Sequence, residues 1–294
     1  MEFEPISDTG GAEIRGLKLE AGVSSEQAEL IDEALGRFGA LVIREQPLSP
    51  ERLVSLARLL GPVQPHVQRA YQHPDVPEVV FMTNQKSDGS FDEAGARRGA
   101  VEDVNRGWQS DLTYDPVPAE ATFLHALDVP SSGGNTCFCN VTAAYQRLPD
   151  AVKQELNGLR AEFPYAGHKR NRSTAVAASA LDKTAQGQTF AVHPVINQHS
   201  GSHQPGIYAN PLMTSRILDI PAARSEQLLE ILFEAMADRT LQWEHRWLQG
   251  DTLIWDNRGG VMHSGRLDYP KQELRRFIRT TVSGAKLTPY VFKG

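Results

Sequence analysis

The sequence predicts a mainly β fold with flanking helices, of the α+β class, in a single domain over residues 1–294. Short apolar runs rich in β-branched and aromatic residues recur along the chain, as in ALVIRE, ATFLHALDVP, NTCFCNV and TLIWDN. Only a few amphipathic helical segments separate them, and no internal repeat, low-complexity tract or clean linker divides the chain. Short strands with few helices favour a β sandwich or roll that carries its helices on the outside.

Two helices are expected near the N-terminus, on either side of the buried strand ALVIRE. The first begins after Ser24, because Gln27 completes a capping box and apolar residues follow at helical spacing. The second begins after Ser49, because Pro50 takes the first helical position, and Gly61 is expected to stop it.

Two polar stretches interrupt the middle of the chain. Residues 83–107 contain few large apolar side chains and many Gly, Asp and Arg residues, so we expect a long loop that acts as a lid over an active site. A second insertion is expected at about 166–188. The strand-like runs at 121–130 and 135–141 and a short helix at 149–159 lie between the two.

The last third of the chain is predicted to return to strands after one long helix. Strand-like runs cover 189–198, and Ser225 is expected to open the helix SEQLLEILFEAMA. The runs TLIWDN and LRRFIRTTVSG are then two strands, with a turn-rich link between them.

Composition and charge exclude several classes of protein. The net charge of −6 contains no block of like charge, which argues against a nucleic-acid surface or a polybasic membrane anchor. The N-terminus lacks the basic and apolar regions of a signal peptide, and no apolar run reaches the roughly 18 residues of a membrane span. Cys137 and Cys139 point the same way on a strand and are badly placed to bridge, so we expect a reducing, cytoplasmic setting.

Four short motifs carry the chemistry, and their order along the chain is the signal. They are WQSD with Asp111, GGNT with Thr136, WDNRGGVMHSG with His263, and RRFIR with Arg275 and Arg279. A carboxylate oxygen and an imidazole nitrogen together suit Fe(II) with open coordination positions. Arginine binds carboxylates through bidentate charge-assisted hydrogen bonds, which suits a dicarboxylate co-substrate.

The spacing within RRFIR predicts how its arginines are used. Residues four apart on a strand share a face, so Arg275 and Arg279 can both point into the roll while Arg276 points away. Two arginines inside a closed roll would be uncompensated buried charges without an anion, which favours a retained anion-binding pocket.

In this order the motifs resemble the taurine dioxygenase (TauD/TfdA-like) family of Fe(II)- and 2-oxoglutarate-dependent dioxygenases. The resemblance covers nearly the whole chain, including the segments at 38–63, 193–201 and 209–218. It implies a double-stranded β-helix, or jelly roll, with the metal at the open end. It also implies the cofactors Fe(II) and 2-oxoglutarate, with O2 and a small, anionic organic molecule as substrates and succinate and CO2 as products. Relatives commonly form dimers or tetramers, so a homo-oligomer is expected.

Carried over position by position, the resemblance assigns roles to individual residues. Asp111 and His263 match metal ligands, Thr136 and Arg275 match the residues that hold the distal carboxylate of 2-oxoglutarate, and Arg279 matches an arginine that grips an anionic substrate group. The positions that line the substrate pocket in the family are Asn105, Tyr71, Gln68, Tyr165 and Met213. Tyr165 and Met213 fit an ordinary core position equally well. Gln68 stands where taurine-specific members have a histidine, which argues against taurine as the substrate.

The first metal-ligand position differs from that of the family, because Gln109 stands where the family has a histidine ligand. An amide oxygen is a poorer donor to Fe(II) than imidazole, although glutamine is neutral and has a similar reach. Three interpretations follow. In the first, the site binds iron through Gln109, or through two protein ligands with 2-oxoglutarate and water, and the enzyme is active. In the second, the chain is a metal-site-degenerate homologue that binds 2-oxoglutarate or another small carboxylate without catalysis. In the third, Gln109 is an introduced substitution in an active enzyme. A structural or different metal, such as Zn(II), is a further alternative.

Overall fold

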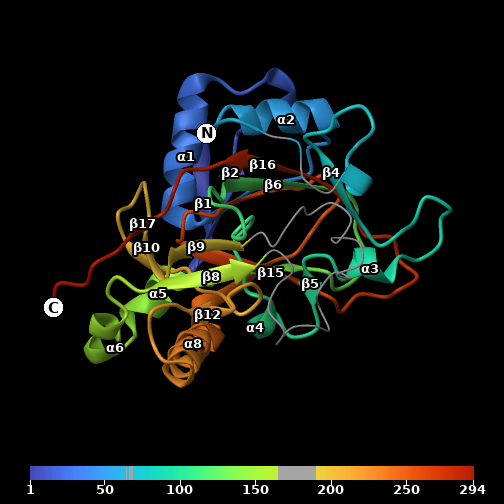
Figure 1. Ribbon diagram of the computed structural model, residues 1–294. Helices are drawn as coiled ribbons and strands as arrows, with labels where there is room; N and C mark the ends of the chain where they lie inside the picture. Colours follow the sequence, from blue (N-terminus) through green and yellow to red (C-terminus); the bar gives the residue numbers. More distant parts are fainter. Residues whose placement is uncertain (64, 66–68, 165–189) are drawn as a thin grey trace.

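Two β-sheets that face each other form the centre of the molecule, with helices on their outer sides (Figure 1). The computed structural model describes residues 1–63, 65, 69–164 and 190–294. The larger sheet has the strand order β1 (Glu2–Ser7), β2 (Gly10–Arg15), β3 (Ala40–Ile43), β14 (Thr252–Asp256), β6 (Ala119–Asp128), β16 (Arg276–Ser283) and β4 (Val80–Thr83). The smaller sheet has the order β13 (Gln242–His245), β7 (Thr136–Asn140), β15 (Val261–Arg266) and β5 (Ala100–Val101).

Two three-stranded sheets and several helices complete the described part of the chain. The small sheets contain β11 (Pro205–Ile207), β10 (Ile196–Gln198) and β17 (Thr288–Pro289), and β12 (Arg216–Ile217), β8 (Arg160–Pro164) and β9 (Phe190–Pro194). The helices are α1 (Ser25–Phe38), α2 (Pro50–Arg58), α3 (Glu93–Ala96), α4 (Val104–Gly107), α5 (Val141–Gln146), α6 (Asp150–Glu155) and α8 (Ala222–Ala237). Among them, none has the length and apolarity that a membrane crossing needs.

An aromatic cluster fills the space between the two main sheets. Phe138 of β7 stacks on Trp243 of β13 with ring centroids 4.5 Å apart, and Trp247 meets Phe277 of β16 at 4.7 Å. Both sheets contribute buried apolar residues to this cluster, so it is the interior of the roll. Phe138 and Trp243 are direct partners within the smaller sheet, whereas the Trp247–Phe277 pair joins the segment after β13 to the larger sheet.

The outer faces of both sheets are covered by helices. On the larger sheet, Phe123 and Ile278 point outward and pack with Ile31 of α1 and Leu53 of α2, because neighbouring strand residues point to opposite faces. Residues of α5 and α8 pack on the other side of the smaller sheet. Figure 1 shows α1 and α2 on one side of the molecule and α5 and α8 on the opposite side. The predicted fold class, a mainly β jelly roll with flanking helices, is confirmed.

Capping residues in the sequence predicted the start of α1, whereas the end of α2 and the start of α8 differ from the prediction. The capping box between Ser24 and Gln27 is present at the start of α1. The second helix ends at Arg58 and does not continue to the predicted stop at Gly61. The long helix begins at Ala222, three residues before Ser225, with Pro221 at its N-cap. Ser225 is not the cap, and its hydroxyl accepts the backbone N–H of Ile217 at 2.8 Å, which ties β12 to the helix.

Two predictions about the chain near the site were wrong. Residues 83–107 are not one long loop, since they contain α3, β5 and α4. The link before β16 contains the strand β15, which carries His263 and pairs with both β7 and β5. Its pairing partners are distant in sequence, and the run VMHSGR has only one β-branched residue, so it had no strong local strand signal of its own. The insertion predicted at 166–188 lies outside the described residues.

Candidate metal and co-substrate site

Asp111 follows α4 in the turn before β6, and three neighbours hold its backbone and one carboxylate oxygen. Its backbone N–H donates to Asn257 Oδ1 at 2.9 Å. Its Oδ2 atom accepts hydrogen bonds from the Thr122 hydroxyl at 2.6 Å and from Trp255 Nε1 at 3.1 Å. Thr122 and Trp255 are direct partners in the β6–β14 register, so the larger sheet itself supplies both donors. With Oδ2 satisfied, Oδ1 is the oxygen that remains for a ligand.

His263 and Gln109 face each other across a single β-bridge. Their backbones exchange two hydrogen bonds, of 3.0 and 3.1 Å, and residues paired in this way direct their side chains to the same side of the ladder. His263 Nε2 lies 3.3 Å from Asp111 Oδ1. At this separation the two atoms form an ion-pair contact, and the buried Nε2 atom has no hydrogen-bond partner among the described residues.

The geometry of these side chains fits a metal ion. Two ligand atoms at about 2.1 Å from one metal, seen at a right angle, lie about 3 Å apart. The separation of 3.3 Å between His263 Nε2 and Asp111 Oδ1 matches this value. The described residues contain no group of three His, Cys, Asp or Glu side chains that could hold a metal, so any third protein ligand here would have to be Gln109 or another neutral group.

The charge of Asp111 is stabilised although the carboxylate is buried. Burial alone would raise the pKa of Asp111, but the charges of Arg279 and His263 and the Thr122 hydrogen bond hold that pKa well below its usual range. Arg279 Nη2 lies 2.8 Å from Oδ1. The prediction that both arginines would lack a counter-charge is therefore wrong for Arg279, because β16 brings its guanidinium directly to Asp111.

Arg275 is a buried cation of a different kind. Its Nε donates to the backbone oxygen of Gly134 at 3.2 Å, and its guanidinium lies over the Phe277 ring at 4.4 Å. It forms no ion pair with any residue that the structure describes, and burial lowers the pKa of the group. Gly134 is two residues from Thr136, whose hydroxyl accepts a hydrogen bond from Trp247 Nε1 at 3.1 Å and keeps its own proton to donate. An anion bound by the Arg275 guanidinium and the Thr136 hydroxyl would give Arg275 the charge partner that it lacks.

The remaining predicted residues have varied surroundings. Arg276 pairs with Asp128 at the surface at 2.8 Å, in agreement with the predicted alternation. Asn105 Oδ1 accepts hydrogen bonds from Trp108 and Gln242, so this amide oxygen links α4 to β13. Met213 packs against the core cluster next to α8, and Tyr71 lies under Arg98. Gln68 and Tyr165 lie outside the described residues.

Sequence reasoning missed several residues that surround Asp111. Thr122, Trp255 and Asn257 hold it; the WDN motif contains two of these residues, and none of the four motifs contains Thr122. The Tyr208 hydroxyl is buried with no hydrogen-bond partner in the described part of the chain, and burial together with the nearby Asp111 charge raises the pKa of Tyr208. No sequence rule assigns a tyrosine at this distance to the site.

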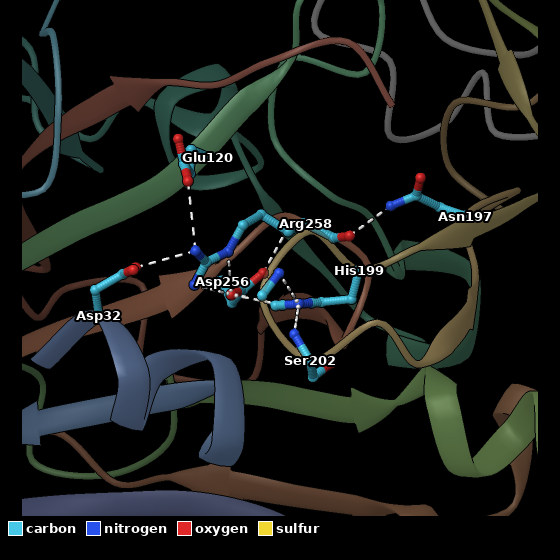
Figure 2. Close-up of polar contacts among 8 residues, drawn as sticks. Asp32, Glu120, Asn197, His199, Ser202, Asp256 and Arg258 are labelled. Atoms are coloured by element: carbon cyan, nitrogen blue, oxygen red, sulfur yellow. Dashed lines mark hydrogen bonds and ion pairs between the residues drawn. The ribbon is translucent and has the colours of Figure 1, made fainter. Parts of the chain in front are cut away.

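A second buried ionic cluster is centred on Asp256, the residue before Asn257, and Figure 2 shows its polar contacts. Asp256 accepts from His199 Nε2 at 3.0 Å and pairs with Arg258 at 2.7 Å. Arg258 also reaches Asp32 of α1 at 3.0 Å and Glu120 of β6 at 3.4 Å. Because Asn257 lies between Asp256 and Arg258, this cluster sets the position from which it contacts Asp111.

Comparison with known proteins gives one consistent result. A family model described as "Taurine catabolism dioxygenase TauD, TfdA family" matches residues 2–281. The chain is 31% identical over 277 residues to the alpha-ketoglutarate-dependent 2,4-dichlorophenoxyacetate dioxygenase of Cupriavidus pinatubonensis, covering 92% of this chain and 95% of the relative. It is 30% identical over 300 residues to the alpha-ketoglutarate-dependent sulfate ester dioxygenase of Pseudomonas putida, covering 97% and 90%.

A solved structure supports the fold independently. The crystal structure of AAD-2 in complex with Mn(II) and N-oxalylglycine superposes with a TM-score of 0.80 at 22% identity, over 98% of this chain and 100% of that one. At this identity the likeness shows the fold alone. The chain therefore belongs to the TauD, TfdA family of dioxygenases, which confirms the predicted enzyme class, 2-oxoglutarate-dependent dioxygenase, and its cofactors Fe(II) and 2-oxoglutarate.

Proposed function

We propose that this chain is catalytically competent and hydroxylates a small, anionic organic molecule. The observation that carries the proposal is the approach of His263 Nε2 to Asp111 Oδ1 at 3.3 Å, directly opposite Gln109. In the overall reaction one atom of O2 enters the substrate as a hydroxyl group and the other enters succinate, while 2-oxoglutarate loses CO2 and supplies two electrons.

Each site residue has one part in this proposal. Asp111, His263 and Gln109 hold Fe(II), which activates O2 when bound. Thr136 and Arg275 bind the distal carboxylate of 2-oxoglutarate, because Arg275 is a buried cation without a carboxylate partner in the described chain. Among the predicted pocket residues, Asn105, Tyr71, Gln68, Tyr165 and Met213 remain candidates for substrate contact.

Arg279 is assigned to the anionic group of the substrate. Its Nη2 atom lies 2.8 Å from Asp111 Oδ1 and neutralises that oxygen. A cation on that oxygen would repel the guanidinium and leave it without a partner, so the arginine would then favour an anion from the substrate. The relatives named for 2,4-dichlorophenoxyacetate and for sulfate esters support an organic carboxylate or sulfate as the substrate class.

The rival function is a non-catalytic carboxylate-binding protein, and Gln109 is the observation that favours it. Anaerobic titration with Fe(II) and 2-oxoglutarate separates the two, because charge-transfer absorbance requires 2-oxoglutarate to chelate bound iron. Succinate formation that needs both reagents supports the oxygenase. Thermal stabilisation by 2-oxoglutarate without metal, combined with no absorbance band and no succinate, would leave the binding protein.

Gln109→His tests the altered metal arm directly. We expect Fe(II) affinity to rise about 10–100-fold, since imidazole is a better ligand for this ion than an amide oxygen. Gln109→Leu is the matched control, and it should weaken iron binding if the amide is a ligand. Unchanged iron affinity in both variants would show that position 109 does not contact the metal, and lower turnover in Gln109→His would assign the glutamine its own part in the reaction.

Two further parts of the proposal concern the setting of the protein. The cysteines Cys137 and Cys139 are both free and buried, which supports a reducing, cytoplasmic location. A homodimer or homotetramer is proposed from the resemblance to the family, and light scattering of the purified protein tests it.

A further inference from the structure

Arg98 is a buried arginine with unsatisfied hydrogen-bond donors. It lies between α3 and β5 and is only 9% exposed. Its Nε and Nη2 atoms have no hydrogen-bond partner, and it forms no ion pair, within the residues that the structure describes. The neighbouring Arg97 is ordinary by comparison, because it pairs with Glu93 at 3.5 Å and with Glu102 at 3.2 Å.

The surroundings of Arg98 connect it to the candidate site. The Gly265 N–H donates to Gly99 O at 3.0 Å, and Ala100 pairs with Gly265, so Arg98 immediately precedes the contact with the strand that carries His263. Burial lowers the pKa of Arg98, and the positive charge of Arg279 lowers it further. The backbone also brings them together: Tyr71, whose ring contacts Arg98, precedes Gln72, Gln72 forms a β-bridge with Val80, and Val80 is the Cα partner of Arg279 on β16.

Tyr71 orients the guanidinium without neutralising it. The Arg98 guanidinium carbon lies 3.4 Å from the Tyr71 ring centroid, which is a stacked cation–π contact. Stacking occupies a face of the guanidinium plane and leaves its edge available. Nε and Nη2 form the edge that offers two parallel N–H groups to the two oxygens of an oxyanion.

This arrangement is unfavourable without a ligand. An unpaired buried charge is costly, and a second positive charge nearby adds repulsion. Asp92 also acts on Arg98 electrostatically, but it is not within ion-pair distance. An anion held by Arg98 and Arg279 would remove both costs at once.

We infer that Arg98, oriented by Tyr71, forms with Arg279 a two-guanidinium site for the oxyanion of the substrate, a carboxylate or a sulfate. Arg98 is then a specificity-determining residue on the segment that was predicted to be a lid. That the anion is the substrate rests on the proposed function, whereas the existence of the anion site does not.

Calorimetry of anion binding tests the inference without turnover. Anaerobic protein with Mn(II) and saturating 2-oxoglutarate is titrated with 2,4-dichlorophenoxyacetate, with hexyl sulfate, and with the neutral methyl ester of the first. We expect wild-type protein to bind at least one anion, and Arg98→Met to bind it about 10–100-fold more weakly, as the loss of charge-assisted hydrogen bonds implies. Arg97→Met is the matched control on the same segment and should bind as wild type does. The two anions decide between carboxylate and sulfate.

Three outcomes would overturn the inference. They are equal affinity in Arg98→Met and wild type, weaker anion binding by wild type with 2-oxoglutarate than without it, and no binding of either anion by wild type. Failure of the proposed function has a different signature, because the anion would still bind at Arg98 while no succinate forms in air with Fe(II).

Thermal unfolding separates a binding role from a structural one. Arg98→Met should keep or raise the Tm of the ligand-free protein, since it removes an unpaired buried charge, while losing the stabilisation by the anion. A lowered Tm with anion binding intact would mean that Arg98 only supports the fold. Arg98→Lys should bind the anion more tightly than Arg98→Met and more weakly than wild type, because lysine restores the charge but cannot form the bidentate hydrogen bonds of a guanidinium.

Discussion

Two buried aspartates in this molecule each lie beside a histidine and an arginine, yet their surroundings differ. Asp256 is 3.0 Å from His199 and 2.7 Å from Arg258, and Asp111 is 3.3 Å from His263 and 2.8 Å from Arg279. Around Asp256 the polar groups are satisfied: His199 Nδ1 accepts two backbone N–H groups, and Arg258 reaches two further carboxylates (Figure 2).

In the Asp111 cluster, by contrast, several buried polar atoms have no hydrogen-bond partner among the described residues. His263 Nε2 has no hydrogen-bond partner among the described residues, and neither do Arg279 Nε and Nη2, because the Nη2 contact with Asp111 has ion-pair distance but poor hydrogen-bond geometry. Buried polar groups are normally paired, so unpaired polar atoms in one cluster mark the place where a ligand belongs. Composition alone does not separate a structural ion cluster from a binding site, but hydrogen-bond satisfaction does.

The largest effect is expected from breaking the Asp256 cluster. Asp256→Asn should lower the free energy of unfolding by about 3–5 kcal/mol, because Arg258 and His199 would lose their buried counter-charge. Asp32→Asn is the matched control and should cost under about 1 kcal/mol, since that partner is half-exposed. Chemical denaturation measures both, and wild-type stability in Asp256→Asn would contradict the comparison.

The corresponding substitution at Asp111 should mainly weaken metal binding and activity, with a smaller effect on stability. Asp111→Asn should weaken Fe(II) binding and turnover by more than about 100-fold, since the loss of a ligand costs at least as much as the loss of a group that supports one. Anaerobic titration and succinate release are the measurements. If Asp111→Asn destabilised the fold as much as Asp256→Asn and left iron binding intact, the two clusters would have the same role.

A smaller effect is expected from the hydroxyl that orients Asp111. Thr122→Val keeps the side-chain shape and removes the 2.6 Å hydrogen bond to Oδ2. We expect about tenfold weaker Fe(II) binding, because Trp255 still donates to the same oxygen. Thr281→Val, at the Cα partner of Thr122 on β16, is the control and should bind iron normally. Equal affinities in the two variants would refute the positioning role.

The smallest expected effect is a change in the pH dependence of stability. Burial raises the pKa of Asp256, but the His199 hydrogen bond and the Arg258 charge outweigh it, so the folded-state pKa is lowered. The stability from this group is thus fully present above its unfolded pKa of about 3.9 and is lost as the pH falls further toward the folded value. Denaturation between pH 3 and 7 should show a shallower acid slope in Asp256→Asn than in wild type, by up to about 1.4 kcal/mol per pH unit. Parallel acid slopes would contradict this.

Local and periodic signals in the sequence determined much of the scaffold. Ser24 and Gln27 mark the start of α1, and Pro50 that of α2, because capping depends on residues close in the chain. The alternation that directs Arg276 outward and Arg279 inward follows from the period of a strand. The order of the four motifs was enough to identify the family, since it does not depend on how the chain folds.

Only the tertiary structure decided which polar groups are satisfied. Thr122 and Trp255 both donate to Asp111 because the β6–β14 register pairs them, although they lie 133 positions apart in the chain. The pairing of Arg279 with Asp111 and the stacking of Arg98 on Tyr71 likewise depend on contacts between distant segments. The sequence gives the donors and acceptors of each residue. Whether these groups already have hydrogen-bond partners depends on distant segments that come together only in the folded chain.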